Sequence, residues 1–261
     1  MNDFEFIIYE KKDRIAYVTI NRPEVLNAIN PPTLVELHAA WNDFRADDDL
    51  WVGILTGAGE RAFCAGSDLK YRVADADDHA LRNPGRRAGN PLDECIKPVI
   101  AAVNGYAVGG GLEWALCCDI IIAAEHAKLG LPEPKRGLLS DTGGVFKLPR
   151  RIPYHLAMEL ILTGKLISAQ EAYRMGLVNE VVPLPDLMAT AERWAHEILE
   201  CAPLSLRAAK ELILKTGDLP VQVGVSTIES IHSVRQLRDS EDYAEGPRAF
   251  AEKRKPNWQG K

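Results

Sequence analysis

Short apolar runs rich in β-branched residues recur through the first part of the chain, and turn-forming residues close most of them. This pattern predicts β-strands, because β-branched side chains pack well on a pleated, buried surface. The predicted strands are Ile15–Ile20, Trp51–Thr56, Pro98–Val103 and Asp119–Ala124.

Apolar residues at helical spacing lie between these strands. Pro31–Phe44 begins with proline, which favours a first helical turn, and carries apolar side chains at positions 34, 37, 41 and 44. Gly110–Cys118 is short and apolar, and we expect it to form a buried helix. The alternation of strands and helices predicts an α/β fold with largely parallel strand pairing.

The chain after Pro183 is expected to be helical, and the predicted helices cover Leu187–Glu200, Pro203–Lys215 and about 221–238. Apolar residues from Pro203 onward need a partner surface and therefore predict subunit contacts. They are Leu204, Leu206, Leu212 and Ile213.

Residues 74–90 break this pattern. The segment is rich in Asp, Arg, Gly and Asn and has weak apolar periodicity, which is typical of a mobile loop or a poorly packed helix. Two readings stay open for it: a lid beside a binding site, or a solvated excursion.

Composition and charge exclude several classes of function. The chain of 261 residues is 46% hydrophobic and 26% charged, as in a globular protein of one large domain, and no run approaches the roughly 20 apolar residues of a membrane span. A net charge of −6 argues against a nucleic-acid partner, although it allows a small phosphorylated ligand held by local bases.

Cysteine usage points to a reducing compartment. Five cysteines is an odd number, and Cys117 and Cys118 are adjacent, which does not fit a disulfide framework. The acidic start of the chain differs from a secretory signal, so we expect a cytoplasmic protein. The cysteines and the six scattered histidines show no zinc spacing, and we predict no metal site.

Two glycine-containing turns are the main candidates for chemistry. Ala65-Gly66-Ser67-Asp68 and Gly109-Gly110-Gly111 each follow a strand-like run and could present a bare backbone N–H, from Ser67 and from Gly110. Two converging donors would form an oxyanion hole. The alternatives are tight turns that bind nothing, or a nucleotide loop, although neither common nucleotide motif is present.

Two glutamates accompany these turns. Glu113 lies one turn into the apolar helix, where an unpaired carboxylate would cost several kcal/mol, which favours a function over a salt-bridged helix residue. Glu133 lies between Pro132 and Pro134 and by itself fits a solvated turn residue. Together they could divide acid and base roles beside a carbonyl. Asp68 is expected to cap the helix that starts near Leu69.

Ordered motifs from near Ile7 to the C-terminus resemble the enoyl-CoA hydratase (crotonase) superfamily. The motifs are Asn21-Arg22-Pro23 with Asn27-Ala28-Ile29-Asn30, Phe63 to Asp68, Asn104 to Glu113, Cys118-Asp119, Gly130 to Glu133, Leu162-Thr163-Gly164, Ala169 to Ala172, Gly176-Leu177-Val178 and Ala249 to Arg254. The resemblance implies a spiral of ββα units over residues 1–195 and a helical trimerisation region over 196–261. It also implies a homohexamer built as a dimer of trimers.

The resemblance implies an acyl-CoA thioester as the ligand, with no separate cofactor because coenzyme A is part of the substrate. Its carbonyl would lie between the N–H groups of Ser67 and Gly110. Glu113 would orient and deprotonate water, and Glu133 would exchange the proton at Cα. Further substrate-binding positions implied by the resemblance are Ala65, Lys70, Phe250 and Lys253, the last near a subunit boundary.

Within the superfamily the chain is most similar to the carnitinyl-CoA dehydratase subgroup. The similarity lies in Leu131 to Gly144, in Ser240 to Pro247 and in Pro256-Asn257-Trp258. Asp141 replaces the glycine of typical short-chain hydratases. Its alternatives are a third acid/base group, a carboxylate that binds a cationic or hydroxylated acyl tail, and a cap for the helix beginning near Gly143.

The resulting prediction is an enzyme that adds water to, or removes it from, a 2-enoyl-CoA. Other crotonase chemistry, namely isomerisation, thioester hydrolysis or retro-aldol cleavage, is the alternative enzyme class. A non-catalytic acyl-CoA binding protein is the third class, but such a protein has no use for two carboxylates beside an oxyanion hole.

Overall fold

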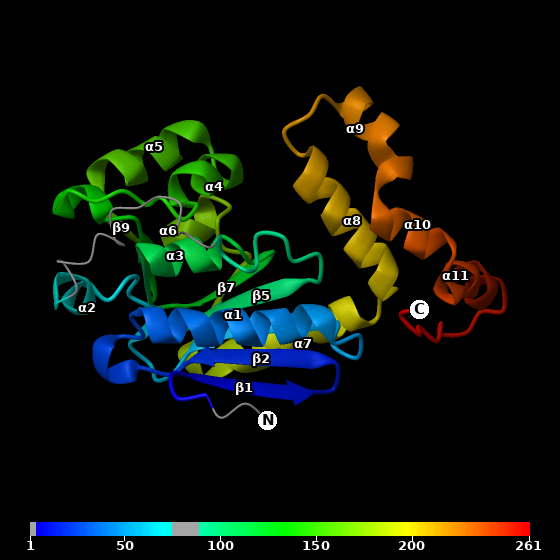
Figure 1. Cartoon of the computed structure of the whole chain (residues 1–261), viewed down its shortest axis with the longest axis horizontal. Helices are drawn as coiled ribbons and strands as arrows, with labels where there is room; N and C mark the ends of the chain where they lie inside the picture. Colours follow the sequence, from blue (N-terminus) through cyan, green and yellow to red (C-terminus); the bar gives the residue numbers. More distant parts are fainter. Residues whose placement is uncertain (1–3, 75–88) are drawn as a thin grey trace.

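Two sheets and a set of covering helices make up the fold (Figure 1). The computed structural model describes residues 4–74 and 89–261, without the side chains of residues 72–74. The segment predicted over 74–90, with its lid and loop alternatives, lies almost wholly outside the described residues.

The larger sheet has the strand order β1-β2-β3-β5-β7-β10. Its strands pair in parallel except for β1, which runs antiparallel to β2. Their bounds are β1 Ile7–Lys12, β2 Ile15–Ile20, β3 Val52–Gly57, β5 Val99–Val103, β7 Ile120–Ala124 and β10 Glu180–Val182. The four predicted strands are confirmed to within one residue at each end, because their side chains fill the core of this sheet.

The smaller sheet has the order β4-β6-β8-β9, with three residues in each strand: β4 Ala62–Cys64, β6 Tyr106–Val108, β8 Lys128–Gly130 and β9 Leu166–Ser168. Each of β3, β5 and β7 in the larger sheet is followed by a strand of the smaller one, β4, β6 and β8. A short helix then follows each pair: α2 Leu69–Ala74, α3 Gly110–Ala115 or the 3-10 turn η4 Glu133–Arg136. This repetition confirms the predicted α/β fold built from ββα units.

The remaining helices cover the sheets or extend beyond them. Those before the C-terminal region are η1 Pro23–Val25, α1 Pro31–Ala46, α4 Gly144–Arg151, α5 Tyr154–Thr163, α6 Ala169–Arg174, η5 Leu184–Asp186 and α7 Leu187–Leu199. Those within the C-terminal region are α8 Pro203–Thr216, α9 Val221–Thr227, η6 Ile228–Ser230, α10 His232–Arg238 and α11 Glu241–Ala251. The predicted helices at 31–44, 187–200 and 203–215 are confirmed, whereas the expected helical segment 221–238 is broken into α9, η6 and α10.

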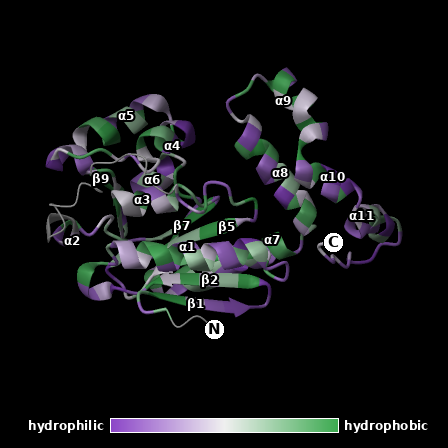
Figure 2. Cartoon of the chain, in the orientation of Figure 1, coloured by the Kyte–Doolittle hydropathy of each residue, from purple (hydrophilic) through white to green (hydrophobic). Residues whose placement is uncertain are grey.

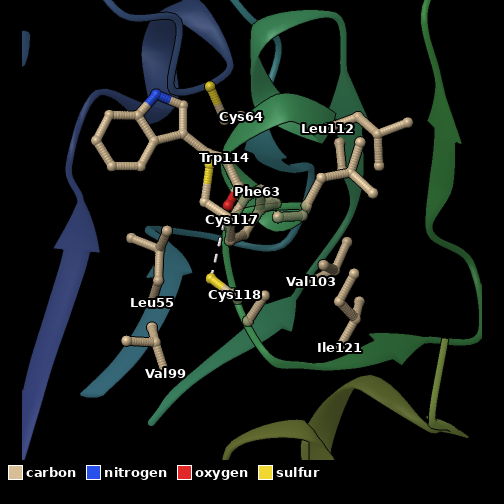
Figure 3. Close-up of a cluster of buried hydrophobic side chains, with 14 of the residues drawn as sticks. Leu55, Phe63, Cys64, Val99, Val103, Leu112, Trp114, Cys117, Cys118 and Ile121 are labelled. Atoms are coloured by element: carbon tan, nitrogen blue, oxygen red, sulfur yellow. Dashed lines mark hydrogen bonds between the residues drawn. The ribbon is translucent and has the colours of Figure 1, made fainter. Parts of the chain in front are cut away.

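A continuous apolar core joins the two sheets to α1 and α3. Figure 3 shows Phe63 of β4, Val103 of β5 and Leu112 of α3 meeting there, with the thiols of Cys117 and Cys118 among them. The opposite face of the larger sheet is covered by α7, whose Leu187, Ala191 and Ala195 are buried against the strands. The predicted helix Gly110–Cys118 is therefore buried, although its regular part ends at Ala115.

Helices α8 to α11 stand apart from the sheets in Figure 1, and residues of α8, η6 and α10 form a small apolar cluster of their own. Leu204 is only 1% exposed and Leu212 packs into that cluster, so the prediction that these two need a partner subunit was wrong. Ile213, at 67% exposure, fits the prediction. The predicted division at residue 195 stays a prediction, and its boundary falls inside α7.

Candidate active site

The two glycine-containing turns singled out in the sequence are in contact. Gly66 has φ +90°, and a Cβ there would lie 2.8 Å from the Val108 carbonyl oxygen and 3.0 Å from the Gly110 nitrogen. Glycine is needed at this position both for its backbone conformation and for the close approach. A parallel bridge between Ile29 and Ser67, with Ile29 N–H donating to Gly66 O at 2.8 Å, holds the first turn in place.

Ser67 N, Gly110 and Glu113 surround one small space. A Cβ built on Gly110 would lie 3.6 Å from Ser67 N and 3.8 Å from Glu113 Oε2. Gly110 is the first residue of α3, where helical N–H groups have no partner within the helix. Among hydrogen bonds within the described ranges, neither the Ser67 nor the Gly110 N–H donates to a loop or side-chain acceptor. The structure thus brings both predicted donors beside a predicted carboxylate.

Glu113 is buried, at 4% exposure, and well supplied with donors. The backbone N–H groups of Thr142 and Gly144 donate to its Oε1 at 2.9 and 2.8 Å, and the Thr142 hydroxyl donates to Oε2. These donors come from the N-terminus of α4, where the helix dipole also favours a negative charge. Its burial agrees with the expectation that Glu113 is not an indifferent surface group, and its catalytic role stays a prediction.

Glu133 lies beside the same space. A Cβ on Gly109 would lie 3.0 Å from Glu133 Oε1, which places this carboxyl beside the start of α3. Its Oε2 is buried and accepts no hydrogen bond from the described residues. Burial raises the pKa of Glu133, and the nearby Glu113 charge adds to the rise, against hydrogen bonds from its own backbone N–H and from Ser140. The two carboxyls therefore lie in different environments, Glu113 with three hydrogen bonds and Glu133 with a buried oxygen that accepts none from the described residues.

The raised pKa of Glu133 predicts a pH-dependent gain in stability for Glu133→Gln. A carboxyl whose folded-state pKa exceeds its unfolded value binds its proton more tightly when folded, so its contribution is lost as pH rises through that range. Thermal unfolding should show the Gln variant more stable than wild type near neutral pH, with the difference shrinking towards about pH 4. A difference independent of pH would contradict this.

Three other predicted residues lie near the first turn. Asp68 accepts from Tyr71 N–H at 3.3 Å, as predicted for a cap of α2, and its second oxygen pairs with Arg22 at 3.2 Å. Ala65 is partly buried and donates its N–H to Leu26 O, and Lys70 is exposed on α2. The substrate-binding roles of Ala65 and Lys70 stay predictions.

Asp141 lies one residue before Thr142, in the turn that leads into α4. The N-cap of α4 is Gly143, which has no side chain to make a capping hydrogen bond. Its side chain makes an interaction of its own within the protein. The helix-cap, acid/base and tail-binding alternatives all stay predictions.

Phe250 and Lys253 are not brought to the site within one chain. Phe250 is 88% exposed on α11, and Lys253 follows that helix. Figure 1 shows α11 at the far end of the molecule from α2 and well apart from α3. Their substrate-binding roles stay predictions.

Sequence reasoning missed the groups that hold Glu113. Thr142 and Gly144 entered only as part of a motif of resemblance, yet they supply three hydrogen bonds to the carboxylate. The available signal was a Thr-Gly-Gly run opening a helix, which exposes backbone N–H groups to an anion.

Among the residues that the structure describes, no cluster of His, Cys, Asp and Glu side chains is suited to holding a metal ion. Nor does any helix in those ranges have the length and apolarity needed to cross a membrane.

Comparison with known proteins places this geometry in a family. The family model described as enoyl-CoA hydratase/isomerase matches residues 10–261, and the chain belongs to that family. The predicted resemblance to crotonases is thereby confirmed.

Individual relatives extend over nearly the whole chain. An (E)-benzylidenesuccinyl-CoA hydratase from Thauera aromatica is 42% identical over 97% of this chain and 99% of its own. A carnitinyl-CoA dehydratase from Salmonella typhi is 43% identical over 95% of both chains. The crystal structure of an enoyl-CoA hydratase from Mycobacterium marinum superposes with a TM-score of 0.89 at 40% identity, covering 98% of this chain and 99% of the other.

Proposed function

We propose that this protein catalyses the reversible addition of water to a 2-enoyl-CoA, giving a 3-hydroxyacyl-CoA. The observation that carries the proposal is the meeting of two backbone donors, Ser67 N and Gly110 N, with two carboxyls in different environments. Relatives named as hydratases and dehydratases support the same chemistry.

The thioester carbonyl would accept hydrogen bonds from the Ser67 and Gly110 N–H groups. As water attacks the β-carbon, negative charge develops on this oxygen, and preorganised donors stabilise that charge more strongly than they stabilise the substrate. The N-terminus of α3 adds its partial positive charge at the same point.

The two carboxyls would move the two protons of the reaction. Glu113, which accepts hydrogen bonds from the backbone at the N-terminus of α4, takes a proton from the attacking water, whose oxygen bonds to the β-carbon. Glu133, whose pKa is raised by burial, gives its proton to the α-carbon of the enolate. Every step has a group of this chain to perform it, so the proposal assigns none to a cofactor.

A panel of 2-enoyl-CoA thioesters tests the proposal. Loss of the conjugated thioester absorbance, with a product heavier by one water molecule, is expected for at least one member. Accumulation of an isomer, release of free coenzyme A, or cleavage of a carbon–carbon bond would instead favour other crotonase chemistry. Tight binding with no change in the thioester would favour a binding protein.

Asp141 is proposed to bind a cationic or hydroxylated acyl tail. The relatives at 42% and 43% identity carry names that imply very different acyl groups, so the tail contacts must vary within the family. Asp141→Asn should lower kcat/KM by about 10- to 100-fold for a substrate with a cationic or hydroxylated tail and leave crotonyl-CoA nearly unchanged. Equal loss of kcat with every substrate would make Asp141 an acid/base group instead.

We also propose a homohexamer formed as a dimer of trimers. Exposed apolar side chains gather on α8, α9 and the turn between them, where Figure 2 shows hydrophobic positions among hydrophilic ones. Ile213, Leu219, Val221 and Val225 are 67%, 43%, 77% and 60% exposed. An apolar surface of this kind favours a partner subunit. Light scattering that shows an active monomer would contradict the proposal.

A cytoplasmic location is proposed from the thiols. All five cysteines are free, and four of them are buried. Unpaired cysteines are typical of proteins kept in a reducing compartment.

A further inference from the structure

A charged cluster lies next to the turn whose N–H groups donate to the Glu113 carboxylate. Lys147, in the first turn of α4, donates from Nζ to Cys117 Sγ at 2.8 Å and to Asp93 Oδ1. Cys117 in turn donates to Asp93 Oδ1 at 3.4 Å and to the Glu113 backbone oxygen at 3.1 Å. The cluster joins three segments that are distant in the sequence: α4, the end of α3, and the turn before β5.

Without its hydrogen-bond partners, the Lys147 ammonium would be in an electrostatically unfavourable position. The side chain folds back along α4, since a Cβ on Gly143 would lie 3.0 Å from Nζ. This places a positive charge at the positive end of a helix, which is unfavourable. Burial also raises the pKa of the Cys117 thiol to about 12, so Cys117 stays protonated and Asp93 supplies the only formal counter-charge within the cluster.

The cluster and the donors of Glu113 share the same backbone. Lys147 N–H donates to Gly143 O at 2.8 Å, and Gly143 lies between Thr142 and Gly144, whose N–H groups hold Glu113. Lys147 therefore adds a second side-chain tie between this turn and the segment after α3, beside the one that Glu113 makes.

We infer that Lys147, held by Asp93 and Cys117, is a positioning residue that fixes the N-terminal turn of α4 so that its N–H groups align the Glu113 carboxylate. The inference rests on the proposed function and adds a residue that acts through Glu113 without contacting the substrate. Misplacement of a catalytic group by about 1 Å is enough to cost roughly 100-fold in rate.

Lys147→Met tests the inference, with Lys147→Arg as the conservative variant. The Met variant should lose roughly 10- to 100-fold in kcat while KM for the acyl-CoA changes by less than about threefold. Arginine can reach the same partners and should recover most of the rate. Lys11→Met is the matched control, because Lys11 also ties two elements together through Asp43 and Asp47, at 2.6 and 2.7 Å, but on β1.

A second readout does not depend on turnover. The amide protons of Thr142 and Gly144 should exchange with solvent roughly tenfold faster in Lys147→Met than in wild type, because their turn opens more often. Asp93→Asn, a change at a partly exposed side chain, should give the same effects in weaker form and serves if the Met variant does not fold.

Unchanged amide exchange overturns the inference, as does a variant with normal kcat and only a lower melting temperature. A raised KM with normal kcat also overturns it, since Lys147 would then bind substrate. If wild type hydrates no enoyl-CoA, the proposed function fails while the exchange measurement still decides the positioning role. If Glu113→Gln is inactive but Lys147→Met turns over normally, only the inference fails.

Discussion

Glu113→Gln and Glu133→Gln should each lower kcat by about 100- to 10,000-fold, the usual contribution of a general acid or base. Glutamine keeps the size of the side chain but can neither take a proton from water nor give one to carbon. Binding of the CoA ester should change far less, because most of the ligand is held elsewhere. Steady-state kinetics and a direct binding measurement on each variant check both parts.

The two variants should differ in their effect on the folded protein. Glutamine at position 113 replaces the charged acceptor of the Thr142 and Gly144 N–H groups with a neutral one, and should lower stability. Glutamine at position 133 replaces a carboxyl that has a buried oxygen without a hydrogen-bond partner among the described residues, and should raise stability near neutral pH. Near-wild-type turnover in either variant would remove that residue from the mechanism.

Gly110→Val should nearly abolish activity in a protein that still folds. The first added carbon makes only ordinary contacts, at 3.4 Å or more, but it lies between Ser67 N and Glu113 Oε2, where the thioester oxygen would bind. The branched side chain then blocks that oxygen from both donors, and loss of one donor alone costs roughly 3–4 kcal/mol of transition-state stabilisation. Turnover numbers and circular dichroism together check the effect.

Ser67→Ala is the matched control for Gly110→Val. Only the backbone N–H of residue 67 is asked to bind the oxygen, and alanine keeps that group. A mild effect is therefore expected. A severe defect would show that the hydroxyl has a role of its own, and full activity of Gly110→Val would contradict the oxyanion hole.

The sequence predicted the parts of this fold whose signal is local. Strands such as Val99–Val103 are apolar throughout, and Pro31–Ala46 has a helical period with proline at its start, so burial alone defines them. The three-residue strands of the smaller sheet carry too few residues for any period to show. Their place is set by pairing with strands far away in the chain, as for β6 between β4 and β8.

In the site, too, the sequence predicted only the features that have a local signal. The glycine turns and Glu113 are visible in the sequence because small residues and a carboxylate in an apolar helix are unusual. The donors to Glu113 are mostly backbone groups of residues 142 and 144, and backbone groups leave little trace in a sequence. Leu204 shows the converse error, since an apolar helix face predicts burial but does not say whether the same chain provides the cover.

Isotope labelling tests directly whether the protein adds water across the double bond of a 2-enoyl-CoA. Wild-type protein is incubated with a 2-enoyl-CoA that it consumes, in water carrying both heavy oxygen and deuterium, and the product is fragmented in a mass spectrometer. The account predicts heavy oxygen on the β-carbon and one deuterium on the α-carbon of an intact CoA thioester. Heavy oxygen in a released carboxylate, or deuterium in the product without heavy oxygen, would contradict it.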